Sequence, residues 1–183
     1  MQLTPAQLST LKAWVVANNS SIFDQSAVTA LNANATPDYY VFKKTIDLFS
    51  VMSNGYDWTV VDNETVNQAR IWDRMLYLSE KQGGVAPWKT AVLKGVGEAY
   101  KGASGAVVAH RRNIVRVHFT KLATKFESLY LAAAADWNVG TNADKTGNRG
   151  LDTNPDVTAL DANSEPIYSP VDLATVIASE SAA

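Results

Sequence analysis

The sequence predicts an all-α protein, a helical bundle organised around one long helix and followed by an extended C-terminal arm. Apolar residues recur at helical spacing along most of the first 137 residues, and the alternation typical of strands is nearly absent. Beyond that point Gly, Pro, Asn, Asp and Thr replace most of the large apolar residues. We therefore expect a helical bundle domain over residues 1–137 and an extended, acidic arm over residues 138–183.

Capping residues and apolar spacing predict five helices ahead of the long one, over about residues 5–18, 25–33, 37–52, 63–81 and 87–101. The first begins at a capping box formed by Thr4 and Gln7, with a proline in the first turn. Pro37 ends the second helix and opens the third, because proline cannot continue a helix but suits its start. Gly83 ends the fourth helix, and Pro87 opens the fifth.

The central element of the predicted fold is one long helix from Ser104 to Trp137. Ser104 is a favourable N-cap, and no Gly or Pro interrupts the chain from residue 106 to residue 139. Apolar side chains recur there in steps of three, four or seven and so share one face: Val108, Val115, Phe119, Leu122, Phe126, Leu129 and Ala133. A helix of about thirty residues is roughly 45 Å long. We expect the shorter helices to pack along it.

Charge is unevenly distributed along the chain. Residues 1–126 hold 14 basic and 9 acidic side chains, whereas residues 127–183 hold 2 basic and 9 acidic ones. The long helix carries the basic side chains that we take as an interaction surface: Arg111, Arg112, Arg116, Lys121 and Lys125. Three interpretations stay open: a solvated face partly neutralised by the chain's own acidic tail, contact with a neighbouring subunit's acidic arm, or direct contact with nucleic acid. The sequence pI of about 5.6 favours acidic protein over sequence-specific reading of DNA.

No pattern in the sequence indicates catalysis, a cofactor or a metal. His110 and His118 are eight residues apart, too far to hold one metal in the manner of an i, i+4 pair. A polar run from Asn142 resembles the start of a calcium loop, but Thr153 stands where a bidentate Glu is required. The chain has no cysteine, no nucleophile elbow and no phosphate-binding glycine loop. We expect a protein that is not an enzyme and that uses no cofactor.

The predicted arm ends in a cluster of apolar residues. A turn-rich segment of this composition cannot offset its own ordering entropy, which is about 1–2 kcal/mol per residue for the backbone. We therefore expect the arm to dock on a neighbouring subunit or on another protein. The side chains predicted to anchor it follow Pro166 and are Ile167, Tyr168, Leu173, Val176 and Ile177.

Four short segments occur in an order that carries a family resemblance. They are LTPAQLSTLKA (3–13), YDWTVVDN (56–63), ARIWDRM (69–75) and HRRNIVRVHFTKLATKFESL (110–129). Together they resemble a family of small, mostly uncharacterised proteins that are encoded among the virion-structure genes of tailed bacteriophages. The resemblance covers about residues 3–137, and a weaker similarity occurs near residues 166–177.

The resemblance implies a structural protein of the phage particle. Within that class, a long spine helix with an extended arm is similar to head-to-tail adaptor (neck or connector) proteins, which form a ring below the portal. The implied partners are further copies of the chain, the portal and tail proteins and, by non-specific contact, packaged DNA. The implied location is the virion, assembled in the host cytoplasm. Alternatives are a tail terminator, a minor head protein or a cytoplasmic nucleic-acid-binding helical module.

The sequence gives no sign of a membrane partner. No apolar run is long enough to cross a bilayer, and the first residues have neither the basic region nor the apolar stretch of a signal peptide. We expect a soluble protein.

Overall fold

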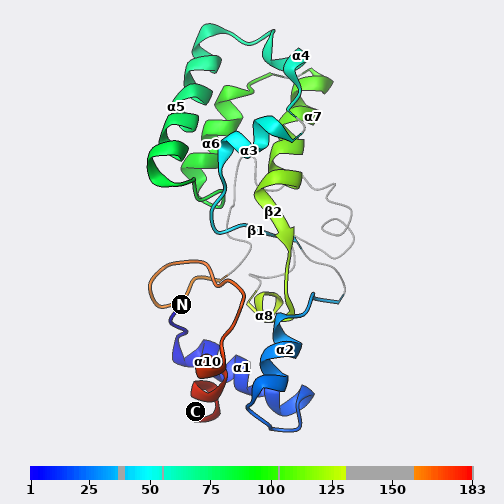
Figure 1. The fold of residues 1–183 in the computed structure, drawn as a ribbon, viewed down its shortest axis with the longest axis vertical. Helices are drawn as coiled ribbons and strands as arrows, with labels where there is room; N and C mark the ends of the chain where they lie inside the picture. Colours follow the sequence, from blue (N-terminus) through cyan, green and yellow to red (C-terminus); the bar gives the residue numbers. More distant parts are fainter. Residues whose placement is uncertain (37–39, 55, 103, 131–158, 183) are drawn as a thin grey trace. The chain divides into compact units, whose positions relative to one another are not determined.

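The computed structural model describes residues 1–36, 40–54, 56–102, 104–130 and 159–182 (Figure 1). Helices make up 57% of these residues and strand 8%. The all-α prediction is therefore confirmed at the level of a mostly helical protein. The described residues do not, however, form a single long helix, and those near the C-terminus do not form an extended arm.

The described residues divide into two compact units. Unit 1 comprises residues 1–41, 122–130 and 159–182, and unit 2 comprises residues 42–121. Unit 2 is therefore an insertion in the sequence of unit 1. The chain leaves unit 1 in strand β1 (Tyr40–Phe42) and returns in strand β2 (Thr120–Leu122), and the two strands form a two-stranded sheet. This division differs from the expected one at residue 137, because the two ends of the chain pack together.

Unit 1 contains helices α1, α2, α8 and α10, which span Pro5–Asn18, Gln25–Asn32, Lys125–Ser128 and Leu173–Glu180. The predicted capping box is present at the start of α1. The backbone N–H of Gln7 donates to the Thr4 hydroxyl, and the backbone N–H of Thr4 donates to the Gln7 side chain. Asp24 caps α2 by accepting hydrogen bonds from the first N–H groups of that helix. Both helices begin where the sequence predicts.

The core of unit 1 draws on three separate stretches of sequence. Its buried side chains are Leu3, Leu11, Val15, Ala27, Val28, Leu31, Phe126, Tyr130, Ile167, Val171 and Val176. Helix α10 packs against both α1 and α2. The C-terminal segment 159–182 is thus a part of the core of unit 1.

Hydrogen bonds also hold the C-terminal segment within unit 1. The Asn32 side chain makes two hydrogen bonds with the backbone of Val171, each 2.9 Å long. The carboxylate of Glu127 is fully buried and accepts a hydrogen bond from the backbone N–H of Ser169 at 2.9 Å. Because a buried carboxylate is costly unless it is hydrogen-bonded, this contact favours one fixed position of the segment.

The predicted extended arm is therefore wrong for residues 159–182. Ordering entropy would keep this segment from folding alone, but the partner that offsets the cost is the beginning of the same chain. Gln2, for example, donates its backbone N–H to the Asp161 carboxylate at 2.9 Å. Residues 138–158 of the predicted arm lie outside the described residues.

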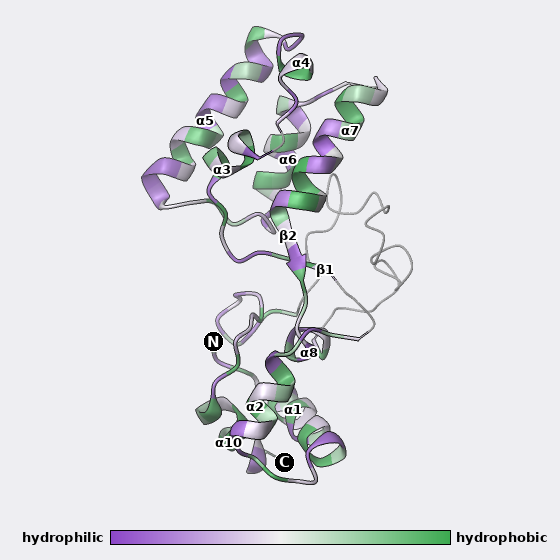
Figure 2. Ribbon diagram, turned by 45° about the vertical axis from the view of Figure 1, so that its right-hand side comes forward, coloured by the Kyte–Doolittle hydropathy of each residue, from purple (hydrophilic) through white to green (hydrophobic). Residues whose placement is uncertain are grey.

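Unit 2 contains α3 (Leu48–Ser53), α4 (Trp58–Val61), α5 (Val66–Gln82), α6 (Thr90–Ala99), α7 (Gly105–Asn113) and the π-helix η1 (Ile114–Phe119). Helices α5 and α6 pack against each other, and α5 carries both hydrophobic and hydrophilic residues along its length (Figure 2). The approach is close at Gly95, where a Cβ would meet Met75 Sδ at 2.6 Å. Gly83, with a φ of 67°, ends α5 as predicted.

The helix predicted over residues 37–52 is only partly present. Tyr40–Phe42 form β1, and α3 accounts for the end of the predicted segment. Aromatic and β-branched residues such as those of β1 suit a strand once a pairing partner is available. Asp47 then caps α3 by accepting the backbone N–H of Phe49 at 3.0 Å.

The predicted long helix ends at Phe119. Helix α7 continues into η1, and Thr120 then adopts extended backbone angles of φ −112° and ψ 159°. Two backbone hydrogen bonds hold the chain in this extended path: Lys43 donates to the Phe119 carbonyl at 2.8 Å, and Ala35 donates to the Ala123 carbonyl at 3.0 Å. Pairing with a distant segment thus prevails over local helix propensity.

A new helix begins after the break. Thr124 and Glu127 form a capping box that starts α8. The same Thr-x-x-Glu pattern stands in the sequence within the stretch predicted as continuous helix, and it is a start signal. The remainder of the predicted long helix, from residue 131 onward, lies outside the described residues.

The Ile167→Ala variant should destabilise unit 1, because it removes a fully buried side chain that the C-terminal segment contributes. The expected loss in the free energy of unfolding is about 2–5 kcal/mol. Ile177→Ala is the matched control, since Ile177 is 49% exposed on α10 and its truncation should change stability by less than about 0.5 kcal/mol. Denaturant titration followed by circular dichroism measures both. Equal effects of the two variants would contradict the burial of residues 159–182.

Phe119→Ala and Phe126→Ala should each lower the free energy of unfolding by about 3–5 kcal/mol. Both side chains are fully buried, Phe119 in unit 2 and Phe126 in unit 1. Each variant therefore reports on a different core. Thermal unfolding measures the loss, and unchanged melting temperatures for both variants would refute the assigned cores.

Candidate functional site

The two units differ in charge. Residues 42–121, which form unit 2, hold 12 basic and 7 acidic side chains, a net charge of +5. The rest of the chain holds 4 basic and 11 acidic side chains, a net charge of −7. The structural division therefore separates the charges, and an anion would be attracted to unit 2.

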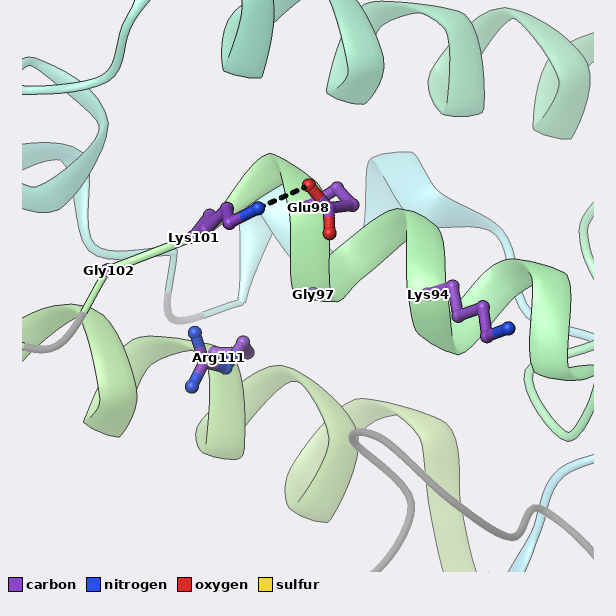
Figure 3. Close-up of a pocket in the computed structure, with 6 residues that line it drawn as sticks. All are labelled: Lys94, Gly97, Glu98, Lys101, Gly102 and Arg111. Carbon is purple, nitrogen blue, oxygen red and sulfur yellow. Dashed lines mark hydrogen bonds and ion pairs between the residues drawn. The ribbon is translucent and has the colours of Figure 1, made fainter.

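A hollow with a volume of about 630 Å³ lies on unit 2 between α6 and α7 (Figure 3). It is lined by Lys94, Gly97, Glu98, Lys101, Gly102 and Arg111. Lys94 and Gly97 share one face of α6, since they are three residues apart, and Lys101 lies in the turn that follows the helix. Arg111 comes from α7, and Figure 3 shows its guanidinium group turned toward that turn.

The three cations of the hollow differ in the hydrogen bonds and ion pairs that they make. Lys101 Nζ lies 3.3 Å from Glu98 Oε2, but both side chains are largely exposed, so the ion pair contributes little to stability. Arg111 Nη1 donates to the backbone carbonyl of Tyr100 at 2.7 Å and so satisfies a carbonyl at the end of α6. Among the described residues, Lys94 has no ion-pair partner.

A second hollow, of about 300 Å³, shares Glu98 and Lys101 with the first. Its other lining residues come from the start of α5 and from its N-cap: Thr65, Asn67, Gln68 and Ile71. The Gln68 side-chain amide donates to the backbone carbonyl of Lys101 at 2.9 Å, which ties α5 to the turn after α6. We call the two hollows together the cationic groove.

The five basic residues predicted to form one surface are distributed over several elements. Arg111 lines the cationic groove. Arg112 and Arg116 lie in α7 and η1, and their side chains are outside what the structure describes. Lys121 lies in β2, and Lys125 begins α8 in unit 1. The five residues therefore do not lie on one continuous helix as predicted, because η1 ends at Phe119, before Lys121.

Sequence reasoning missed Lys94 as a candidate site residue. A signal was present, because Lys94 and Lys101 are seven residues apart with Gly97 between them at helical spacing. In the structure, Lys94 and Gly97 share one face of α6, and Lys101 follows in the turn after the helix. The more conspicuous run of basic residues, which begins at Arg111, belongs to a different element.

The predicted anchors of the C-terminal segment fall into two groups. Ile167 and Val176 are fully buried and belong to the core of their own unit. Tyr168 is half-buried, and burial raises the pKa of its hydroxyl well above the usual value. Leu173 and Ile177 are 37% and 49% exposed, so these two side chains are accessible to a partner.

A buried aromatic cluster fixes the helices that line the cationic groove. Tyr56, Trp72, Tyr100 and His110 pack together with ring centroids 4.8 to 6.1 Å apart. The hydroxyl groups of Tyr56 and Tyr100 are hydrogen-bonded to each other, and burial raises the pKa of Tyr56 to about 12. The four residues join the segment before α4 to α5, to the end of α6 and to α7.

His110 is a neutral member of this cluster. The backbone N–H of Asp57 donates to His110 Nδ1 at 3.3 Å, so we assign the ring proton to Nε2. Burial lowers the pKa of the imidazole, and no described residue accepts a hydrogen bond from Nε2. The described residues also contain no group of three or more His, Cys, Asp or Glu side chains placed to hold a metal ion.

The chain matches no protein-family model, no curated protein and no solved structure. In the part of the chain that the structure describes, no helix is both long enough and apolar enough to span a membrane. Function is therefore inferred from the geometry of the cationic groove, from the surfaces of the two units and from the resemblance of the four sequence segments.

Ionisation of Glu64 should make the stability of unit 2 depend on pH. Burial, together with the nearby charge of Asp73, raises the pKa of Glu64 from 4.5 to about 7. A carboxyl whose pKa is raised by folding contributes stability that declines as pH rises from about 4.5 through about 7. The Glu64→Gln variant lacks this ionisation, so its free energy of unfolding relative to wild type should be higher at pH 8 than at pH 4.5. Denaturant titration at both pH values measures the difference, and a pH-independent difference would contradict the raised pKa.

Proposed function

We propose that this protein is a structural subunit of a tailed bacteriophage particle and, within that class, a head-to-tail adaptor whose copies form a ring below the portal. The role is one of assembly, with no catalytic step. One observation carries the proposal: the four segments that resemble the phage family supply helix starts and buried side chains of both units.

Each of the resembling segments contributes to a core. The first begins α1 and contributes Leu11 to unit 1. The second and third contribute Tyr56 and Trp72 to the aromatic cluster of unit 2. The fourth contributes His110 to that cluster and Phe126 to the core of unit 1. The likeness thus involves residues on which the fold depends, which supports a fold shared with the phage family.

Exposed apolar side chains on both units support a role in assembly. Those of unit 1 include Val16, Ile22, Leu173 and Ile177, and those of unit 2 include Phe49, Trp58, Val66, Tyr77 and Leu78. Trp58 and Tyr77 are 54% and 59% exposed. Exposed aromatic residues are typical of protein interfaces, where they bury a large area at a low cost in side-chain entropy. Neighbouring subunits in a ring, or the portal and tail proteins, would cover them.

The long helix and the extended arm that suggested an adaptor are not present among the described residues, because the helix ends at Phe119 and residues 159–182 pack within unit 1. The adaptor proposal is therefore supported only by the mostly helical fold and by analogy with helical neck proteins. A tail terminator and a minor head protein are the alternatives within the same class.

A second candidate function is that of a nucleic-acid-binding helical module. The net charge of +5 on residues 42–121 and the cationic groove favour it. The two candidates differ in where the protein is found, because only a structural subunit is a constant part of the finished particle.

Purified particles of the phage that encodes this chain should contain it in a fixed copy ratio to the portal protein. Quantitative mass spectrometry of gradient-purified particles measures that ratio, with a phage replication enzyme as the control that should be absent. A phage lacking the gene should produce heads and tails that do not join, as seen by negative-stain microscopy. A chain that is abundant in lysates but missing from particles would overturn the virion role, and normal joining without it would overturn the adaptor role.

A further inference from the structure

We propose that the cationic groove binds the phosphate backbone of nucleic acid without reading its sequence. The groove is lined by three cations, Lys94, Lys101 and Arg111, and by one carboxylate, that of Glu98. This inference rests on the second candidate function and assigns the site and the kind of contact by which nucleic acid would bind. It concerns the isolated protein and can therefore fail or succeed independently of the structural role in the particle.

Each of the three cations can still engage a ligand. Lys94 has no ion-pair partner among the described residues. The Lys101 and Glu98 side chains are 71% and 58% exposed, so a phosphate can replace the carboxylate at little cost. Arg111 uses Nη1 for the Tyr100 carbonyl, and the guanidinium fork has further N–H donors that suit phosphate oxygens.

The larger hollow is open between its two lysines. Gly97 lies on the same face of α6 as Lys94 and has no side chain to fill the space between the two lysines. Lys94 lies on α6, and Lys101 lies beyond the end of that helix in the turn after Tyr100, so the two lysines line the same hollow from successive elements.

The composition of the lining favours phosphate over a peptide. The described wall of the larger hollow consists of charged residues and glycine, and the smaller hollow adds Ile71 as its single large apolar residue among those described. A peptide with apolar side chains would need apolar pockets to anchor them. Asn67 adds a neutral amide of the kind that commonly contacts phosphate.

The described lining favours contacts with phosphate over contacts with bases. Bases stack on aromatic side chains in many single-strand sites, and Arg and Gln read bases in duplex grooves through bidentate contacts. The described lining includes no aromatic side chain, and Arg111 and Gln68 already donate to the backbone carbonyls of Tyr100 and Lys101. Contacts to phosphate alone position a nucleic acid but carry no sequence information.

The charge of unit 2 supports the inference more directly than that of the whole chain. The sequence pI of about 5.6 reflects the whole chain, in which the positive charge of unit 2 is combined with that of a strongly acidic remainder. At about 0.1 M salt, charges act over roughly 10 Å. A polyanion at the groove therefore responds mainly to the local cations.

Binding of the full-length protein to a fluorescein-labelled duplex of about 20 base pairs tests the inference by fluorescence anisotropy across a salt titration. Lys94→Gln should bind about three- to tenfold more weakly at about 50 mM salt. The slope of log K against log salt should become shallower by about 0.9 for each phosphate that the variant leaves unneutralised. Glu98→Gln should bind more tightly than wild type, because it removes the one carboxylate among the described lining residues.

Lys44→Gln is the matched control, because Lys44 is an exposed lysine of unit 2 outside the groove. Weakening by this variant as large as that by Lys94→Gln would show that net charge alone matters and would overturn the site. More than about tenfold preference between two unrelated duplexes would overturn sequence independence. Displacement of the duplex by poly-glutamate as effectively as by unlabelled DNA would assign the groove to an acidic protein instead. Absence of duplex binding would refute the inference while leaving the virion role untouched.

Discussion

The packing of the C-terminal segment against the first helix is the contact on which the rest of the structure depends. Leu11 of α1 and Val176 of α10 are both fully buried in one core, although almost the whole chain lies between them in sequence. Unit 2 is inserted between the parts of unit 1, and it begins and ends at two strands that pair with each other. A domain can accept such an insertion when the two ends of the insert lie close together. The pairing of β1 with β2 brings the two ends of unit 2 together.

Within unit 2, Tyr100 connects the core to the surface. Its side chain is fully buried against Trp72 and His110, while its backbone carbonyl accepts the hydrogen bond from Arg111. The residue is also the C-cap of α6, the helix that carries Lys94. The packed aromatic cluster thus fixes the two helices that carry Lys94 and Arg111, and a site supported by a rigid core holds its geometry better than one built on a loop. This arrangement gives the YDW and ARIWD motifs a role in positioning the groove.

Local signals in the sequence predicted local structure, whereas long-range pairing decided the rest. The capping box at Thr4 and the left-handed cap at Gly83 are where the sequence predicts them, since each depends on neighbouring residues only. The break after Phe119 depends on Lys43, a residue far away in sequence, and no helical periodicity could indicate it. The candidate site, too, was predicted where local signals sufficed and missed where long-range packing decided. Arg111 was predicted from a run of basic residues, but Lys94 was missed because helical spacing does not say which helices face each other.

The two signs of charge in this protein are divided between different parts of its fold. A net charge of −2 over the whole chain conceals +5 on residues 42–121 and −7 on the remainder. Screening limits each charge to roughly 10 Å at about 0.1 M salt, so the two signs act on different partners. The acidic remainder disfavours any contact of its own with a polyanion, and contact is thereby confined to unit 2. An insertion that carries the cations can in this way meet nucleic acid, while the exposed apolar side chains of both units stay available for protein partners.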